Sequence, residues 1–189
     1  MKRIVLGLLL AVAIMSSSCN AKREWDAKKI LKQEEALLAK AKISQVDSAD
    51  VAGLLNAYEG YAEKHPNDTM GIEFLFKAAS FYEYLGKPIK GASIYEKVYT
   101  NYPSYSKRPY ALFMQGLIYE DKLGNLDVAR QKYSQFLKEY PEHPIAKDVK
   151  IALAQLGKTP EQLMAEIMAA QHQDSLAMAS KVRFFHSGL

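Results

Sequence analysis

The sequence predicts an all-α protein of stacked helix hairpins, and three observations support this fold class. Of the 189 residues, 49% are hydrophobic and 24% are charged, a composition too apolar for a disordered chain. Three segments end at Pro66, Pro103 and Pro141, which recur at almost equal intervals. Five, eight and twelve residues before each proline lie mostly apolar, aromatic or small residues, a spacing that places them on one helix face. A regular period of this kind is typical of a helical solenoid.

The repeated unit is a helix, a short turn, a second helix and a proline turn. We expect eight helices, at residues 24–43, 48–65, 69–85, 88–101, 106–123, 126–140, 144–156 and 160–182. Asp47 is a plausible N-cap for the second helix. Gly86 and Gly124 follow the third and fifth helices, where a left-handed residue ends a helix. The fold class that we expect is a short right-handed α-solenoid, in which a proline stops each second helix.

The last helix has the strongest start signal in the chain. Thr159 is the expected N-cap, Pro160 occupies the first helical position and Gln162 completes a capping box. Its apolar stripe consists of Leu163, Met164, Ile167, Met168 and Leu176. We expect a capping helix that covers the last repeat, because terminal repeats need a cap with a polar outer face. An alternative is that this helix folds into the groove of the solenoid.

The first nineteen residues have the organisation of a secretory signal. Lys2 and Arg3 precede twelve uncharged residues, Ile4 to Met15. A membrane-spanning helix needs about 20 apolar residues, so this segment is short for a span and suits a signal. Three serines then lead to Cys19, the only cysteine, which excludes an intramolecular disulfide and a multi-cysteine metal site.

Residues 1–19 resemble a bacterial lipoprotein signal peptide, although Ser16 stands where that family usually has an aliphatic residue. The resemblance implies that residues 1–18 are removed and that Cys19 carries a covalent lipid, the only expected cofactor. Residues 19–189 would then form one lipid-anchored helical domain. Asn20 implies, by likeness to enteric lipoproteins, the outer membrane of a Gram-negative bacterium. Residues 21–24 lack the acidic run that resembles a surface-export signal, which favours the periplasmic face. Ordinary cleavage near Ala21, a retained anchor and the cell-surface face are alternatives.

The repeated segments resemble the tetratricopeptide repeat over roughly residues 51–157. The likeness depends on Ala129, Tyr133, Phe136 and Pro141 in one helix and on Leu112, Gly116 and Tyr119 in the helix before it. Phe74, Ala78, Phe81 and Gly86 match Leu112, Gly116, Tyr119 and Gly124 at one constant offset along the chain. This long variant resembles the repeats of outer-membrane assembly lipoproteins and Tol–Pal accessory lipoproteins. The resemblance implies a fold and a protein partner but no chemistry.

Motifs for catalysis, nucleotide binding and metal binding are missing from the sequence. There is no GxGxxG, no P-loop and no HExxH. Neighbouring carboxylates such as Glu34 and Glu35 point in different directions on a helix, so they form no acid–base pair. We therefore expect no enzyme and no metal site. The formal charge of +4 is too small to indicate a nucleic-acid partner.

A partner is expected on the concave wall of the solenoid, which the first helix of each hairpin lines. The predicted groove residues are Leu75, Tyr82, Glu83, Tyr110, Phe113, Leu117, Glu120 and Asp121. They combine aromatic anchors with carboxylates, which suits a peptide or an extended segment with basic residues. The predicted function is a non-catalytic scaffold that binds an envelope protein, in β-barrel assembly, secretion or Tol–Pal-type maintenance.

A carbohydrate- or peptidoglycan-binding module is the alternative function. Tyr99, Tyr102 and Tyr105 cluster near Lys107 and Arg108, and exposed tyrosines there would suit sugar or peptide contacts. The other interpretation is that these tyrosines pack the turn. The sequence identifies neither the partner, the envelope pathway nor the oligomeric state.

Overall fold

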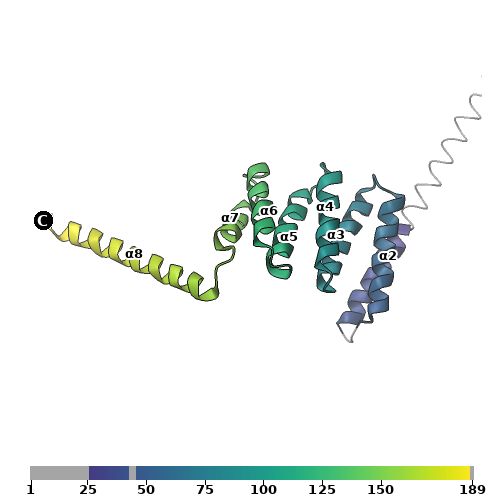
Figure 1. The fold of residues 1–189 in the computed structure, drawn as a ribbon, viewed down its shortest axis with the longest axis horizontal. Helices are drawn as coiled ribbons and strands as arrows, with labels where there is room; N and C mark the ends of the chain where they lie inside the picture. Colours follow the sequence, from purple (N-terminus) through teal and green to yellow (C-terminus); the bar gives the residue numbers. More distant parts are fainter. Residues whose placement is uncertain (1–25, 43–45, 188–189) are drawn as a thin grey trace, which may run out of the picture.

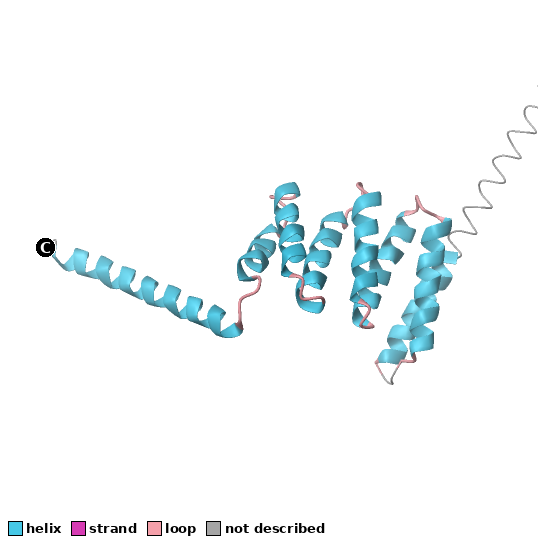
Figure 2. Ribbon diagram, viewed as in Figure 1, coloured by secondary structure: helices cyan, strands magenta, loops and turns pink. Residues whose placement is uncertain are grey.

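A computed structural model describes residues 26–42 and 46–187 of the chain. Every regular element in these residues is helical, as Figure 2 shows, so the predicted all-α class is confirmed. The predicted signal segment and Cys19 lie outside the described residues, as do residues 43–45 and 188–189. No helix in the described part of the chain combines the length and the apolar character needed to cross a bilayer.

The helices follow one another in the order that the proline period predicts. After a first helix at residues 26–41 come α2 (Ser48–Lys64), α3 (Thr69–Tyr84), α4 (Pro88–Asn101), α5 (Arg108–Leu117), the π-helix η1 (Ile118–Lys122), α6 (Leu126–Glu139), α7 (Ala146–Gln155) and α8 (Pro160–Ser187). From α2 to α7 each helix packs on the next, which forms a short solenoid (Figure 1). The expected helix at 106–123 is divided between α5 and η1.

Capping residues fix the ends of several helices. The Asp47 carboxylate accepts a hydrogen bond from the Ala49 amide at 3.0 Å and so begins α2, as predicted. Asn125 begins α6 in the same way. Gly86 and Gly124 have φ values of 70° and 62°, a conformation that residues with a Cβ rarely adopt. The turns after α3 and η1 therefore depend on glycine.

Aromatic side chains from successive hairpins form the core. Tyr58, Tyr95 and Tyr133 are fully buried, eight residues before the three prolines that define the period. Tyr58 stacks on Phe74 of α3, with ring centroids 4.9 Å apart. The positions five residues before the prolines, Tyr61, Val98 and Phe136, are also buried. The helix face inferred from the proline spacing is therefore the packed face.

The last helix begins as predicted but does not cover the last repeat. The Thr159 amide donates to the Gln162 side chain at 2.9 Å, and the Gln162 amide donates to the Thr159 hydroxyl at 3.3 Å, which completes the capping box. Beyond it α8 extends away from the solenoid (Figure 1). Its larger apolar side chains are exposed, namely Met164, Ile167, Met168, Leu176 and Met178.

The failure of α8 to cap has a physical reason in its own sequence. Gln171 and Asp174 lie on the same side of the helix as Ile167 and Met178, so the apolar stripe is interrupted after its first turns. The preceding helix pair is already closed, because Leu156 is buried and Leu126 lies against Gly157. The described α8 therefore neither caps the stack nor occupies its groove.

Candidate interaction groove

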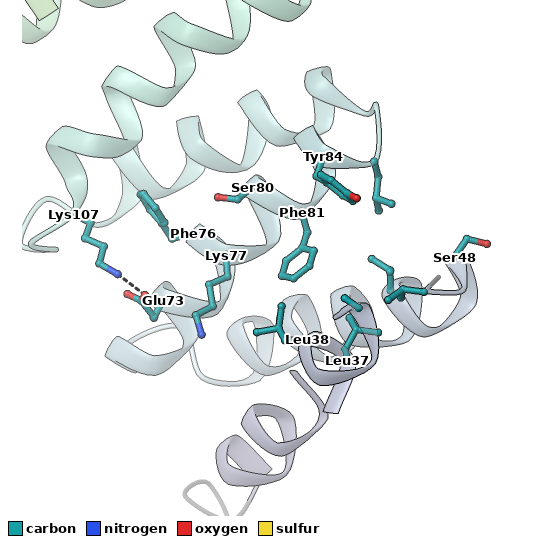
Figure 3. Close-up of a pocket in the computed structure, with 14 residues that line it drawn as sticks. Leu37, Leu38, Ser48, Glu73, Phe76, Lys77, Ser80, Phe81, Tyr84 and Lys107 are labelled. Atoms are coloured by element: carbon teal, nitrogen blue, oxygen red, sulfur yellow. Dashed lines mark hydrogen bonds and ion pairs between the residues drawn. The ribbon is translucent and has the colours of Figure 1, made fainter. Parts of the chain in front are cut away.

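A groove of about 840 Å³ opens between the 26–41 helix, α2, α3 and the start of α5 (Figure 3). Its floor is mainly apolar and includes Leu37, Val51 and Phe81. Leu38 and Tyr84 stand at its edge with 48% and 87% of their surface exposed. An apolar hollow of this size with a few polar groups is the usual form of a binding site.

One face of α3 lines the groove. The lining residues of this helix are Glu73, Phe76, Lys77, Ser80, Phe81 and Tyr84. Their spacing of three and four residues places most of them along one side of α3, where Phe81 lies near Tyr58 of α2 and Phe76 lies near Tyr95 of α4. The groove is therefore formed by the first helices of two successive hairpins, as a concave wall requires.

Ion pairs hold the wall of the groove in place. Lys107 donates to Glu73 at 2.5 Å (Figure 3). The Tyr105 hydroxyl donates to the other oxygen of the same carboxylate. Burial opposes ionisation of Glu73, but the two hydrogen bonds and the positive charges of Lys107 and Lys77 together outweigh it and lower the pKa of the carboxyl group. Lys77 reaches across to Glu34 of the first helix at 2.7 Å. Four charged side chains thus join three helices around an apolar floor.

The predicted groove residues on α3 lie on a different face from the residues that line the groove. Leu75 is 3% exposed and belongs to the core. The Tyr82 hydroxyl donates to Glu59 of α2 at 2.6 Å, and Lys90 of α4 lies over the Tyr82 ring. None of Leu75, Tyr82 and Glu83 lines this groove, and their role in binding a partner stays a prediction.

A one-residue error in register explains this result. The sequence pattern pairs Ala78, rather than Ala79, with Gly116 of the following hairpin. In the structure, a Cβ on Gly91 of α4 would lie 2.9 Å from the Ala79 carbonyl oxygen, so the close approach to α4 involves Ala79. Moving the pattern by one residue rotates the predicted face by about 100°. Counting from Ala79 would have identified Phe76 and Ser80 as groove residues.

The predicted residues on α5 and η1 are closer to the expected arrangement. Tyr110 and Asp121 are exposed, while Phe113 and Leu117 are half-buried, so these four form a partly open face. Glu120 accepts a hydrogen bond from the buried Tyr133 hydroxyl at 2.6 Å, and it therefore has a partner within the fold. None of these residues lines the groove, which lies nearer the N-terminal end of the stack.

The tyrosine cluster proposed for sugar binding packs the turn between α4 and α5. Tyr99 and Tyr105 are each 8% exposed. The Tyr99 hydroxyl donates to Glu139 at 2.7 Å, and the Arg108 guanidinium lies 4.2 Å from the centre of the Tyr99 ring. Burial and the Glu139 carboxylate raise the pKa of Tyr99 to about 12. These contacts join α4, α5 and α6, and they favour the packing interpretation.

No three His, Cys, Asp or Glu side chains in the described residues form a group that could hold a metal ion. The remaining question is which known repeat the hairpins represent. The comparison with protein families matches residues 110–143 to the tetratricopeptide repeat. The matched segment begins inside α5 and contains η1, α6 and the turn that follows them.

Tetratricopeptide repeats generally mediate protein–protein interactions and are typically non-catalytic scaffolds. No curated protein matches the chain at a significant level. The α3–α4 hairpin repeats the architecture of the matched segment, with Gly86, Tyr95 and Pro103 in the places of Gly124, Tyr133 and Pro141. The groove on α3 is therefore a feature of a helical-repeat stack.

Proposed function

We propose that this protein is a lipid-anchored scaffold of a Gram-negative envelope that binds a segment of another envelope protein in the groove on α3. The observation that carries the proposal is the apolar floor at Phe76 and Phe81 beside the exposed Tyr84, on a repeat stack. Exposed apolar surfaces with a polar rim are typical of interaction sites. Tyrosine supplies a large contact area at a low cost in side-chain entropy.

The membrane location is supported by the resemblance of residues 1–19 to a lipoprotein signal. Seven residue steps separate Cys19 from Asp26, the first described residue. A chain spans at most about 3.5 Å per residue, so a lipid on Cys19 would keep the first helix within about 25 Å of the bilayer. We propose the outer membrane and its periplasmic face, with β-barrel assembly, secretion or Tol–Pal-type maintenance as the setting. The anchor would raise the local concentration of the scaffold near its partner.

The groove can be tested by crosslinking the full-length protein in intact cells and quantifying co-purified proteins by mass spectrometry. Tyr84→Ala combined with Leu38→Asp should reduce capture of the main partner about tenfold, because both side chains line the groove. Ile89→Asp is the matched control, since Ile89 is 73% exposed on α4 and does not line the groove. Equal capture by the groove variant and the control would refute the assignment, provided that both keep the helical circular dichroism.

The anchor has its own test. The full-length protein should incorporate a clickable fatty acid and sediment with membranes, and Cys19→Ser should abolish both. Ser17→Ala is the control, because it alters the same segment without removing the thiol. Labelling that persists in Cys19→Ser would contradict the anchor while leaving the groove assignment in place.

A further inference from the structure

The Tyr58 hydroxyl is buried and has no hydrogen-bond partner among the described residues. Its counterparts in the next two hairpins both have one. Tyr95 pairs with Ser80 at 2.6 Å, and Tyr133 donates to Glu120 at 2.6 Å. Both partners lie on the preceding helix of the same hairpin. Buried polar groups in native structures are nearly always satisfied, so this exception calls for a physical reason.

Glu34 is the polar group of the first helix that lies near the Tyr58 hydroxyl. Burial raises the pKa of Tyr58, and the nearby Glu34 carboxylate raises it further. Both oxygens of this carboxylate instead accept from Lys77 of α3, at 2.9 and 2.7 Å. One carboxylate thus has two donors within its reach and satisfies only one of them.

Glu34 lies in the middle of the face by which the first helix packs. The buried residues of this helix are Ala27, Ile30 and Leu37, which stand seven and four residues before Glu34 and three after it. These spacings place all four side chains on one side of the helix. The Glu34 side chain is itself only 14% exposed. The unsatisfied Tyr58 hydroxyl therefore destabilises the centre of this interface, because water would satisfy it if the helix moved away.

We propose that Glu34, Lys77 and Tyr58 form a latch with two positions for the first helix. In the position that the structure shows, Glu34 holds the helix to α3 through Lys77 and leaves the Tyr58 hydroxyl unsatisfied. This loss lowers the cost of opening the first helix while α2 to α7 stay folded. When Lys77 is drawn away, Glu34 accepts from Tyr58 and holds the helix to α2 instead. Lys77 also lines the groove, so a group that engages it there would move the latch (Figure 3).

The test is amide hydrogen exchange of the full-length protein, with mass spectrometry of peptides from the first helix, α3 and α6. The first helix should exchange at least about tenfold faster than α3 and α6, because it opens without them. Tyr58→Phe removes the unsatisfied hydroxyl and keeps the ring that stacks on Phe74. First-helix exchange should then slow by about fivefold or more, since opening no longer hydrates a buried hydroxyl. Unchanged or faster exchange in Tyr58→Phe would overturn the proposal.

Tyr95→Phe is the matched control for the loss of a hydroxyl. It makes the same change at the corresponding position of the next hairpin, where the hydroxyl has Ser80 as its partner. Because opening of the first helix does not expose Tyr95, first-helix exchange should stay within about twofold of the unmodified protein. Slowing equal to that in Tyr58→Phe would show that the effect is not specific to the unsatisfied hydroxyl, which contradicts the latch.

A second variant tests the change of partner. Lys77→Met removes the ammonium group and keeps a long side chain, so Glu34 becomes free to accept from Tyr58. In this background Tyr58→Phe should accelerate first-helix exchange by about fivefold, the opposite of its effect in the unmodified protein. Lys90→Met is the control, since Lys90 of α4 pairs with Glu59 of α2, and there Tyr58→Phe should still slow the exchange. Slowing by Tyr58→Phe in both backgrounds would show that Glu34 does not change partners.

The latch can be separated from simpler behaviour and from the scaffold function. A terminal helix that only frays would exchange at the same rate in every variant. A helix that opened only with the whole stack would exchange no faster than α3 and α6. Either result would refute the latch. None of these measurements involves a partner, so the latch and the proposed scaffold function can fail independently.

Discussion

The α3–α4 hairpin and the α5–η1–α6 hairpin have the same design, yet they differ by one residue. Each ends its first helix at a left-handed glycine, Gly86 or Gly124, and each buries a tyrosine from its second helix, Tyr95 or Tyr133. In the first hairpin α3 is a regular α-helix up to Tyr84. In the second, the last turns widen into η1, where the Leu123 amide donates to the Ile118 carbonyl at 3.1 Å.

The π-helix accommodates the additional residue. Four of the five buried positions of α3 correspond, at a single offset, to buried positions of α5, namely Phe74, Leu75, Ala78 and Ala79 to Ala111, Leu112, Gln115 and Gly116. The glycines that end the two helices are separated by one residue more than this offset. A single wide turn between these points restores the register, which is how a one-residue insertion is commonly accommodated in a helix. The constant offset expected from the sequence, which paired Phe74 with Leu112, is therefore wrong before η1.

The buried tyrosines have different partners as a consequence. The Tyr95 hydroxyl lies 2.6 Å from the Ser80 hydroxyl, and the Tyr95 ring contacts the edge of Phe76. The Tyr133 hydroxyl instead donates to the Glu120 carboxylate, and its ring lies directly over Gly116. The two hairpins thus show that similar helices hold their central ring through a neutral pair in one case and through a charged acceptor in the other.

Deleting one residue should affect the two hairpins very differently. Deletion of the exposed Asp121 converts η1 into an ordinary helical turn and should cost about 1 kcal/mol or less. Deletion of the exposed Tyr84 in α3 moves Leu85 and Gly86 around the helix by about 100° and should cost about 3 kcal/mol or more. Urea unfolding followed by circular dichroism measures both. Equal losses of unfolding free energy for the two deletions would show that η1 does not contain an inserted residue.

Adding a methyl group at Gly116 should destabilise the second hairpin, whereas the same change in a more open helix should not. A Cβ there would lie 2.3 Å from the Tyr133 ring, whose burial leaves little freedom to move. Gly116→Ala should therefore lower the free energy of unfolding by about 2 kcal/mol. Gly60→Ala in α2, where a Cβ meets nothing within 4 Å, should instead raise it by roughly 0.5–1 kcal/mol. Thermal and urea unfolding should show opposite signs for the two variants.

The charged and neutral tyrosine partners should differ in strength. Glu120→Ala removes a carboxylate acceptor and should cost about 2 kcal/mol, whereas Ser80→Ala removes a neutral hydroxyl and should cost about 1 kcal/mol. Combining each substitution with Tyr133→Phe or Tyr95→Phe gives the coupling energy of each pair. A coupling for Ser80 equal to that for Glu120 would contradict the proposed difference.

Alkaline pH should weaken the fold through Tyr95. Burial and the Glu83 carboxylate raise the pKa of Tyr95 to about 12, against an opposing hydrogen bond with Ser80. Because the folded pKa lies above the usual value of about 10, this stabilisation is complete below about pH 10 and is lost as the pH rises toward about 12. By about pH 10.5 the loss should be roughly 0.8 kcal/mol. Tyr95→Phe should remove this component from the pH dependence of the unfolding free energy.

The ends of the helices could be predicted from the sequence more accurately than the directions in which the helix faces point. Asp47, Gly86 and Thr159 mark ends through local chemistry, and the structure confirms each of them. A face depends on long-range register, and an error of one residue turned Leu75 toward the expected groove when it lies in the core. The π-helix leaves no composition signal. The apolar stripe of α8 predicted that the helix packs, but a stripe does not specify its partner.

Ion pairs and hydrogen bonds between helices join neighbouring hairpins. Glu34 pairs with Lys77, Glu73 with Lys107 and Glu139 with Tyr99, and the consecutive packing from α2 to α7 follows the same order. Stability in such an array is a sum of nearest-neighbour interfaces. Detachment of the first helix alone would therefore remove one wall of the groove, while the hairpins behind it would keep their own interfaces.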